Sequence, residues 1–203
     1  MNKNLSRSRT LHLTQLALLT AILLLMAFTP LGYLKILTLS ITFLTIPVVI
    51  GATALGTTDG AILGLVFGIT SYAQCFGMDP FGTAIFSMKP VATFIICVVS
   101  RLLCGLGAAA IYKLCNINAK KPRPLSYVGA GVAAPFLNTL FFLGFLAIFF
   151  NNTTVTVAGE ELDVVKAVVL PALSLNSILE IVICSVLSFG VLMALSRVEK
   201  RIR

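Results

Sequence analysis

The sequence predicts an all-α integral membrane protein, a compact bundle of six transmembrane helices that forms a single domain over residues 1–203. Three observations support this fold class. Hydrophobic residues make up 58% of the chain and charged residues 11%, whereas a soluble domain carries about 25% charged residues. Six apolar stretches approach the ~20 residues that a helix needs to cross a bilayer. The basic residues gather in alternate gaps between these stretches.

Turn-forming residues mark where the first three apolar stretches end. The cluster Thr29-Pro-Leu-Gly-Tyr33 opens an outer loop over residues 29–40, and residues 56–60 form a tight inner turn. Pro47 lies inside the second stretch, so that helix is expected to be tilted or broken there. The six predicted transmembrane helices cover residues 11–28, 41–55, 61–75, 90–114, 125–150 and 171–196.

The later connections are longer. Residues 76–89 contain Gly77 and Pro80 and are expected to form an outer loop. A basic inner loop over residues 115–124 separates the fourth and fifth helices, and an outer loop over residues 151–170 precedes the sixth.

Lysine and arginine are distributed unevenly between the two sides of the predicted bundle. The alternate gaps on one side carry three, Lys35, Lys89 and Lys166. Eleven of the 15 basic residues lie on the other side, namely Lys3, Arg7, Arg9, Lys113, Lys120, Lys121, Arg123, Arg197, Lys200, Arg201 and Arg203. Because basic residues remain on the cytoplasmic side, both the N- and C-termini are predicted to be cytoplasmic.

Several functions find no support in the sequence. The net charge of +8 lies at the membrane face, where anionic headgroups explain it better than nucleic acid does. His12 and five scattered cysteines show no metal-ligand spacing. No nucleophile motif and no phosphate-binding GxxxxGK[ST] loop occurs. We therefore expect no enzyme, no metal and no cofactor, and the energy for any active transport would come from another chain or an ion gradient.

Polar residues deep in a membrane are costly, at about 2.5–3.5 kcal/mol or more for each charge. Arg101 and Glu180 lie at similar depths in the fourth and sixth predicted helices, in the middle to outer half. Asn138 lies near the middle of the fifth helix, and Asn176 lies one turn outward of Glu180. Two interpretations stay open: an Arg101–Glu180 ion pair that holds the bundle together, or a polar pocket for a small solute from outside.

Small residues on two helices allow another helix to approach closely. Ala17 and Ala21 share a face of the first helix, and Gly64 and Gly68 share a face of the third. Each face could pack within the bundle or contact a partner subunit.

Several segments carry a family resemblance over nearly the whole chain: Thr29-Pro-Leu-Gly-Tyr33, Ile46-Pro-Val-Val-Ile-Gly51, residues 60–70, Ser100-Arg-Leu-Leu-Cys-Gly105 and Asn138-Thr139. With these segments the chain resembles the substrate-binding S components of energy-coupling factor (ECF) vitamin importers, and most of all the pantothenate-type members. Ala17 and Ala21 match the alanine motif by which S components dock on a shared transmembrane coupling subunit.

The resemblance implies a protein in the plasma membrane of a prokaryote that binds a vitamin, with pantothenate as the expected one, and delivers it inward. A coupling subunit and two ATPase subunits would complete the importer, and the loop over residues 29–40 would cover the site. S components topple in the membrane to release their vitamin. The alternative is a stand-alone secondary transporter or small channel for a small organic anion, although no internal repeat of the kind such transporters often show is found.

A pantothenate site would use the deep polar residues. Arg101 would bind the carboxylate, and Lys89 would attract the anion at the outer mouth. Glu180 would orient Arg101 or accept a hydroxyl, while the two asparagines would serve the amide and hydroxyls. Pantothenate-type members often carry a histidine before the Ile-Pro pair, where this chain has threonine. The expected binding residues are Thr45, Lys89, Arg101, Asn138, Asn176 and Glu180.

Overall fold

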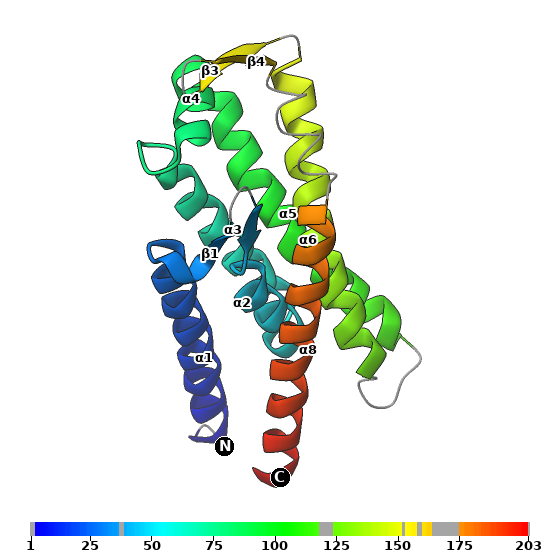
Figure 1. Ribbon diagram of the computed structural model, residues 1–203. Coiled ribbons are helices and arrows are strands. Elements are labelled where there is room, and N and C mark those ends of the chain that lie inside the picture. Colours follow the sequence, from blue (N-terminus) through cyan, green and yellow to red (C-terminus); the bar gives the residue numbers. More distant parts are fainter. Residues whose placement is uncertain are drawn as a thin grey trace.

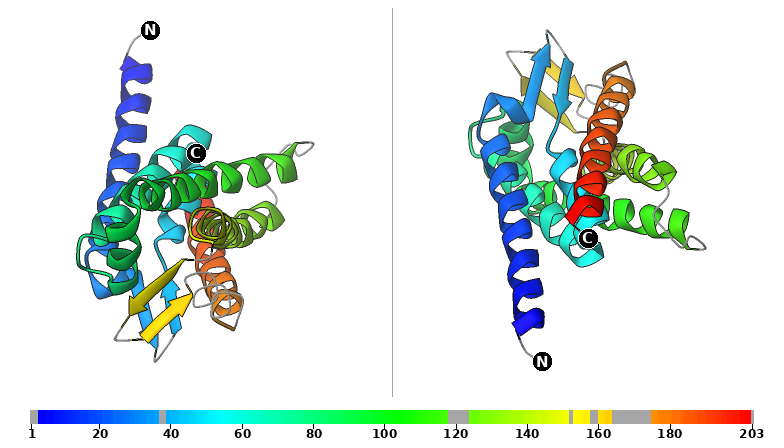
Figure 2. Two further views of the ribbon diagram at one scale, coloured as in Figure 1. Left: turned by 90° about the horizontal axis from the view of Figure 1, so that it is seen from above. Right: turned by 90° about the horizontal axis from the view of Figure 1, so that it is seen from below.

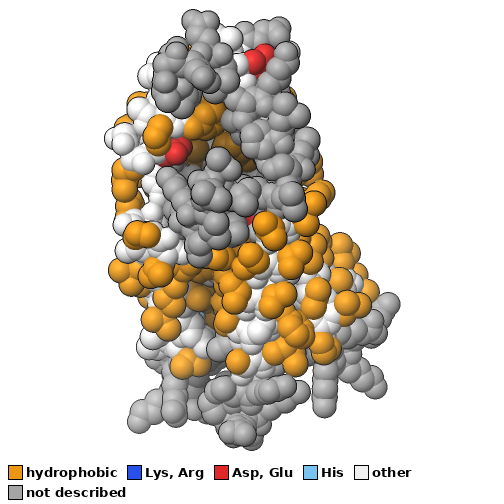
Figure 3. Space-filling model, viewed as in Figure 1, with side chains coloured by type: hydrophobic (Ala, Val, Ile, Leu, Met, Phe, Trp, Pro, Cys, Tyr) orange, Lys and Arg blue, Asp and Glu red, His pale blue; other side chains and the backbone are white. Residues whose placement is uncertain are grey.

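The computed structural model describes residues 3–36, 39–117, 124–151, 153–157, 160–163 and 175–202. Among these, three helical segments are long and apolar enough to cross a membrane, over Arg9–Ala27, Pro90–Asn116 and Pro124–Phe149. Shorter apolar helical segments cover Thr45–Leu55 and Ile178–Ala194. Hydrophobic side chains cover most of the described surface on the face shown in Figure 3. The prediction of a helical membrane protein is therefore confirmed at this level.

Two helices run parallel on one side of the bundle (Figures 1 and 2). They are α1 (Lys3–Ala27) and α3 (Thr57–Gln74). Gly56 precedes α3 with a φ of 137°, a left-handed conformation that glycine adopts without steric cost. This residue turns the chain sharply into α3. The tight turn expected over residues 56–60 is therefore limited to Gly56, because residues 57–60 already belong to α3.

The second predicted helix is shorter than expected. It consists of α2 (Thr45–Ile50) followed by a π-helical turn, η2 (Gly51–Leu55). Pro47 lies in the first turn of α2, where its missing N–H has no helical partner to lose. The geometry therefore changes at Gly51, and Pro47 causes no break.

A β-hairpin replaces the first predicted outer loop. After the short 3₁₀ turn η1 (Pro30–Gly32), β1 (Tyr33–Ile36) pairs antiparallel with β2 (Leu39–Thr42). The predicted second helix began at Ile41, which instead pairs with Leu34 in this hairpin. Apolar periodicity alone cannot separate a short strand from the start of a buried helix.

The other two outer connections also contain regular structure. The segment 76–89 holds α4 (Pro80–Met88), whose first turn is capped by Asp79, a side chain that accepts the Gly82 N–H at 2.7 Å. Proline at the first helical position suits such a start. Within the segment 151–170, β3 (Thr154–Val157) pairs antiparallel with β4 (Glu160–Asp163).

Three long helices complete the bundle: α5 (Pro90–Asn116), α6 (Pro124–Phe149) and α8 (Leu175–Ile202). The sixth helix was predicted from residue 171, but residues 171–174 lie outside the described residues. The end of α8 and the start of α1 lie at the same end of the molecule (Figure 1).

The glycine face of α3 packs within the bundle, against α5. A methyl group on Gly64 would overlap the carbonyl oxygen of Arg101, and one on Gly68 would lie 2.7 Å from the Cα atom of Val98. The two backbones therefore touch directly, which positions Arg101 on α5 relative to α3.

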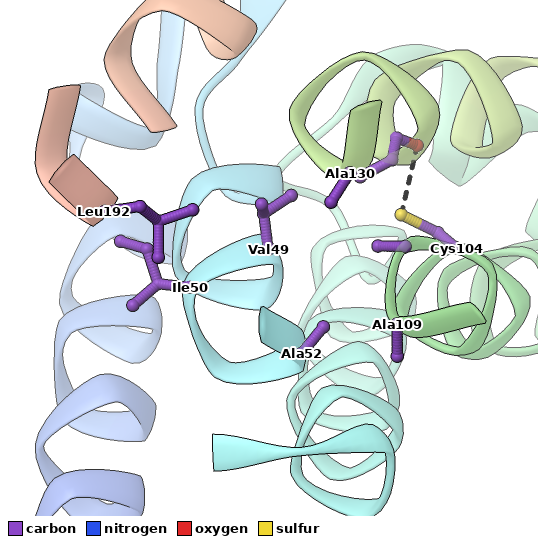
Figure 4. Packing of buried hydrophobic residues seen from close by; sticks show 9 residues of the cluster. Val49, Ile50, Ala52, Cys104, Ala109, Ala130 and Leu192 are labelled. Carbon is purple, nitrogen blue, oxygen red and sulfur yellow. Dashed lines mark hydrogen bonds between the residues drawn. The ribbon is translucent and has the colours of Figure 1, made fainter. Parts of the chain in front are cut away.

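The short second helix lies at the centre of a buried cluster. Val49, Ile50 and Ala52 pack against α5, α6 and α8 (Figure 4). In the same cluster the Cys104 thiol donates to the carbonyl oxygen of Ala134 at 3.1 Å. This core holds the helices that carry the deep polar residues.

Candidate functional site

A cavity of about 700 Å³ lies between the end of α1, the end of α3, α4, α5 and α6. This volume is within the range of small-molecule sites, roughly 300–1,000 Å³. The cavity lies at the opposite end of α1 from the N-terminus, near the connections predicted to be outside. Its lining residues are Ala27, Phe28, Thr29, Pro30, Ser71, Gln74, Cys75, Met78, Asp79, Phe81, Gly82, Ile85, Cys97, Arg101 and Phe142.

Arg101 lies between two aromatic rings in the wall of this cavity. Its guanidinium carbon is 5.3 Å from the ring centre of Phe67 and 5.1 Å from that of Phe142. Its Nη1 atom donates to the carbonyl oxygen of Ile96 at 3.3 Å and to the Ser100 hydroxyl at 3.1 Å. Cation–π contacts of this kind are worth about 0.5–2 kcal/mol, and they hold the side chain in one orientation.

Three of the predicted binding residues have a buried polar atom without a hydrogen-bond partner. Within the described part of the chain, five buried side-chain atoms lack a partner, and these include Arg101 Nε, Asn138 Oδ1 and Glu180 Oε1. Leaving such an atom unpaired costs about 1–3 kcal/mol, and more for charged groups. Of these three residues, Arg101 lines the cavity, so its Nε atom is the one placed near a bound molecule.

Arg101 and Glu180 do not form the direct ion pair that was one interpretation of the sequence. They attract each other electrostatically, but no contact within 4.0 Å joins them. The Glu180 carboxyl is buried and lies near the backbone of Thr42 at the end of β2. Glu180 thus lies beside the β1–β2 hairpin, while the Arg101 guanidinium lines the cavity.

The other predicted binding residues occupy different places. Thr45, Lys89, Asn138 and Glu180 are not part of the cavity lining, whereas Arg101 is. Buried Asn138 lies one turn before the lining residue Phe142 on α6.

Thr45 and Lys89 already have partners. Thr45 is fully buried, and its hydroxyl donates to the Thr42 carbonyl oxygen at 3.5 Å. The ammonium of Lys89 donates to the carbonyl oxygen of Phe149 at 2.8 Å and lies 5.2 Å from the ring centre of Phe150. Lys89 therefore links the start of α5 to the end of α6.

The remaining predicted residues lie on α8 and α1. Asn176 belongs to the first turn of α8, and its side chain lies outside the described part of the structure. Ala17 and Ala21 are both exposed on α1, in contrast to the glycine face of α3. The alanine face is therefore available to a partner.

The cavity also contains polar residues that the sequence did not single out. Ser71, Gln74 and Asp79 all line it. Gln74 and Asp79 flank the connection between α3 and α4, which was interpreted as an irregular loop. The only available signal was the Asp79-Pro80 pair, which is typical of a capped helix start.

The lining can hold an organic anion that also carries hydroxyl or amide groups. A guanidinium held in an apolar wall binds a carboxylate strongly, because little water competes for the charge. Ser71 and Gln74 can donate and accept hydrogen bonds, and Asp79 can accept them.

Comparison with known proteins identifies the family of this chain. Residues 11–192 match the family described as ECF transporter, substrate-specific component. The pantothenic acid transporter PanT of Lactococcus lactis subsp. cremoris is 29% identical over 169 residues, which cover 77% of this chain and 78% of PanT. This chain, which forms apolar helices and a cavity lined by Arg101, is matched over almost its full length. It therefore belongs to the family of substrate-specific components of ECF transporters.

Proposed function

We propose that this protein is the vitamin-binding subunit of an ECF importer in the plasma membrane of a prokaryote, and that its vitamin is pantothenate. Arg101 carries the proposal. It is a cation fixed between Phe67 and Phe142 in the wall of a cavity of suitable size, with its Nε atom unpaired. The similarity to a pantothenic acid transporter supports the choice of vitamin.

In this proposal the carboxylate of pantothenate binds Arg101. The hydroxyl and amide groups of the vitamin form hydrogen bonds with Ser71, Gln74 and Asp79 in the lining. Asn138 and Glu180 each have an unpaired buried atom. In this proposal they orient Arg101, or they bind the vitamin directly once the cavity wall has moved. Asn176 lies one turn outward of Glu180 along α8 and is proposed as a further binding residue.

The proposed arrangement in the membrane is a single domain of six spans with both termini cytoplasmic. The uneven distribution of basic residues supports it, as does the common end shared by the start of α1 and the end of α8. Labelling from outside should reach a cysteine introduced at Glu161 and should not reach one introduced at Lys121. The reverse pattern would contradict the orientation and the outward-facing site together.

Transport in this proposal requires partner subunits. A transmembrane coupling subunit would dock on α1 at Ala17 and Ala21, and two ATPase subunits would supply the energy. Membranes that contain this chain alone should bind pantothenate without accumulating it. Accumulation by this chain alone under an ion gradient would instead support a secondary transporter.

Calorimetry on the purified protein tests the proposed ligand. Pantothenate should bind tightly, and its alcohol analogue, in which a hydroxymethyl group replaces the carboxylate, should bind much more weakly. Arg101→Ala should weaken pantothenate binding by two to four orders of magnitude, as expected for about 3–5 kcal/mol lost with a buried charged partner.

The alcohol analogue also provides the control for folding. Because it lacks the carboxylate, its affinity should change little in Arg101→Ala. Equal losses for both ligands would indicate a structural role for Arg101. Tight binding of a neutral vitamin in place of pantothenate would remove the carboxylate role altogether.

A further inference from the structure

Two thiols touch in the wall of the candidate vitamin pocket. The Sγ atoms of Cys75, at the end of α3, and Cys97, on α5, are 3.9 Å apart. Both residues line the cavity, although only 4% of Cys75 and 3% of Cys97 is exposed. Both are free cysteines. The pair is therefore buried in the protein but borders a space that a small molecule can enter.

Other cysteines in the described part of the chain are arranged differently. The thiol of Cys104 contacts the carbonyl oxygen of Ala134 at 3.1 Å, and that of Cys184 contacts the carbonyl oxygen of Thr42 at 3.5 Å. Each of these sulfurs contacts a backbone oxygen on a neighbouring element. Among the described contacts, Cys75 and Cys97 form the one thiol–thiol pair.

We propose that Cys75 and Cys97 are a redox-sensitive dithiol, which peroxide converts to a reversible disulfide and thereby weakens vitamin binding. The identity of the vitamin rests on the proposed function. A disulfide needs an S–S distance of about 2.05 Å, so the sulfurs must approach by nearly 2 Å. The cavity lies on the side proposed to face the exterior, where disulfides form and persist.

The oxidation balances with one molecule of hydrogen peroxide. The sulfur of one cysteine, as its thiolate, attacks a peroxide oxygen and the O–O bond breaks. This gives a sulfenic acid and a hydroxide, which takes up the thiol proton as water. The second sulfur then attacks the sulfenic sulfur, an S–S bond forms and the S–O bond breaks. The second thiol proton leaves with that oxygen as another water, so two thiols are oxidised and peroxide is reduced to two waters.

Disulfide formation should alter the pocket because Cys75 supports the part of its wall formed by α4. A methyl group on Gly82 would lie 2.8 Å from the Sγ atom of Cys75, so the start of α4 rests on this sulfur. Gln74 precedes Cys75, and Asp79 caps α4. Drawing Cys75 toward Cys97 therefore moves two polar lining residues together with the apolar wall.

Mass spectrometry and calorimetry on the full-length purified protein test the proposal. After peroxide treatment and alkylation, digestion should give a peptide pair linked between Cys75 and Cys97. Pantothenate affinity should fall at least tenfold, and dithiothreitol should restore it. Cys75→Ser and Cys97→Ser should each form no linked peptide, and peroxide should leave their affinities unchanged.

Cys115→Ser is the matched control. Cys115 lies near the far end of α5 and does not line the cavity, so this variant should respond to peroxide as the parent does. Linkage to another cysteine, no linkage, or a linked protein with unchanged affinity would each overturn the proposal. If the reduced parent binds no pantothenate, the proposed function fails, and the linked peptide still decides whether the disulfide forms.

Discussion

The Nε2 atom of His12 on α1 lies 3.0 Å from the Oδ2 atom of Asp59 on α3. At the other end of these helices, the Gln74 carboxamide donates to the carbonyl oxygen of Ala27 at 2.5 Å. Both contacts join residues 47 positions apart, so α1 and α3 run parallel and are connected at both ends. Gln74 and Ala27 line the cavity, whereas the His12–Asp59 contact lies more than three turns of α1 away.

The two contacts should therefore differ in what they control. His12→Ala should speed amide hydrogen exchange in the first turns of α1 and leave the pantothenate dissociation constant within about threefold. Gln74→Leu removes a hydrogen bond at the cavity and should weaken pantothenate binding about tenfold. Hydrogen exchange and calorimetry on both variants measure these effects. A large loss of affinity in His12→Ala would show that the inner contact also shapes the pocket.

The direct contact between α3 and α5 predicts that a larger residue at Gly64 lowers both stability and vitamin binding. Gly64→Ala should lower the stability of the protein by about 1–3 kcal/mol, the usual cost of overpacking a core, because the new methyl group would overlap the carbonyl oxygen of Arg101. Pantothenate binding should weaken as well, since the backbone that carries Arg101 must move. Gly144→Ala on α6 is the control, because a methyl group there meets nothing within 4 Å. Thermal unfolding of the two variants should separate them, and equal melting temperatures would contradict this packing argument.

The alanine face of α1 predicts a separation of binding from transport. Ala17→Trp and Ala21→Trp should retain pantothenate affinity but lose uptake in membranes that contain the partner subunits, because close helix approach needs small side chains. Leu18→Trp is the comparison. Leu18 is 61% exposed, and it points about 100° around the helix from Ala17, so uptake should persist. Unchanged uptake in all three variants would make the alanine face ordinary lipid-facing surface.

Glu180 and Asn176 on α8 should differ in their effects on vitamin binding and on stability. Glu180→Gln and Asn176→Ala should each weaken pantothenate binding, whereas only Glu180→Gln should also lower the melting temperature, because Glu180 is buried near the end of β2. Asn176→Ala should leave the helix intact. If Asn176→Ala binds pantothenate as tightly as the parent, the vitamin does not reach this part of α8, and the site is limited to the cavity around Arg101.

Composition and spacing predicted the helices well where the apolar runs were long. α5 and α6 cover almost the full predicted ranges of the fourth and fifth helices. Prediction was weakest where short elements lie between helices. Strand β2 and helix α4 are too short for their periodicity to stand out. β2 forms by pairing with β1, and α4 begins at the local Asp79 cap.

The sequence also indicated which deep residues were unusual, but not how their side chains are directed. Depth along a helix follows from residue number, and the structure has Glu180 buried and Arg101 partly buried. Their partners depend on helix rotation. Arg101 is directed between Phe67 and Phe142, and rings on two other helices cannot be assigned to it from spacing alone.

Helix α1 leaves most of its surface uncovered by the rest of the chain. Only 11% of its apolar segment is buried, and Leu11, Leu13, Leu18 and Leu25 are each between 61% and 67% exposed. In a bilayer, acyl chains complete the packing that the protein itself does not provide. Since lipid tails are as apolar as leucine, exchanging them for a neighbouring protein helix gains little from hydrophobicity, and shape must decide the outcome. In the proposed function, an association built on shape alone would be easily reversed, and α1 would exchange a partner helix for lipid at each cycle of transport.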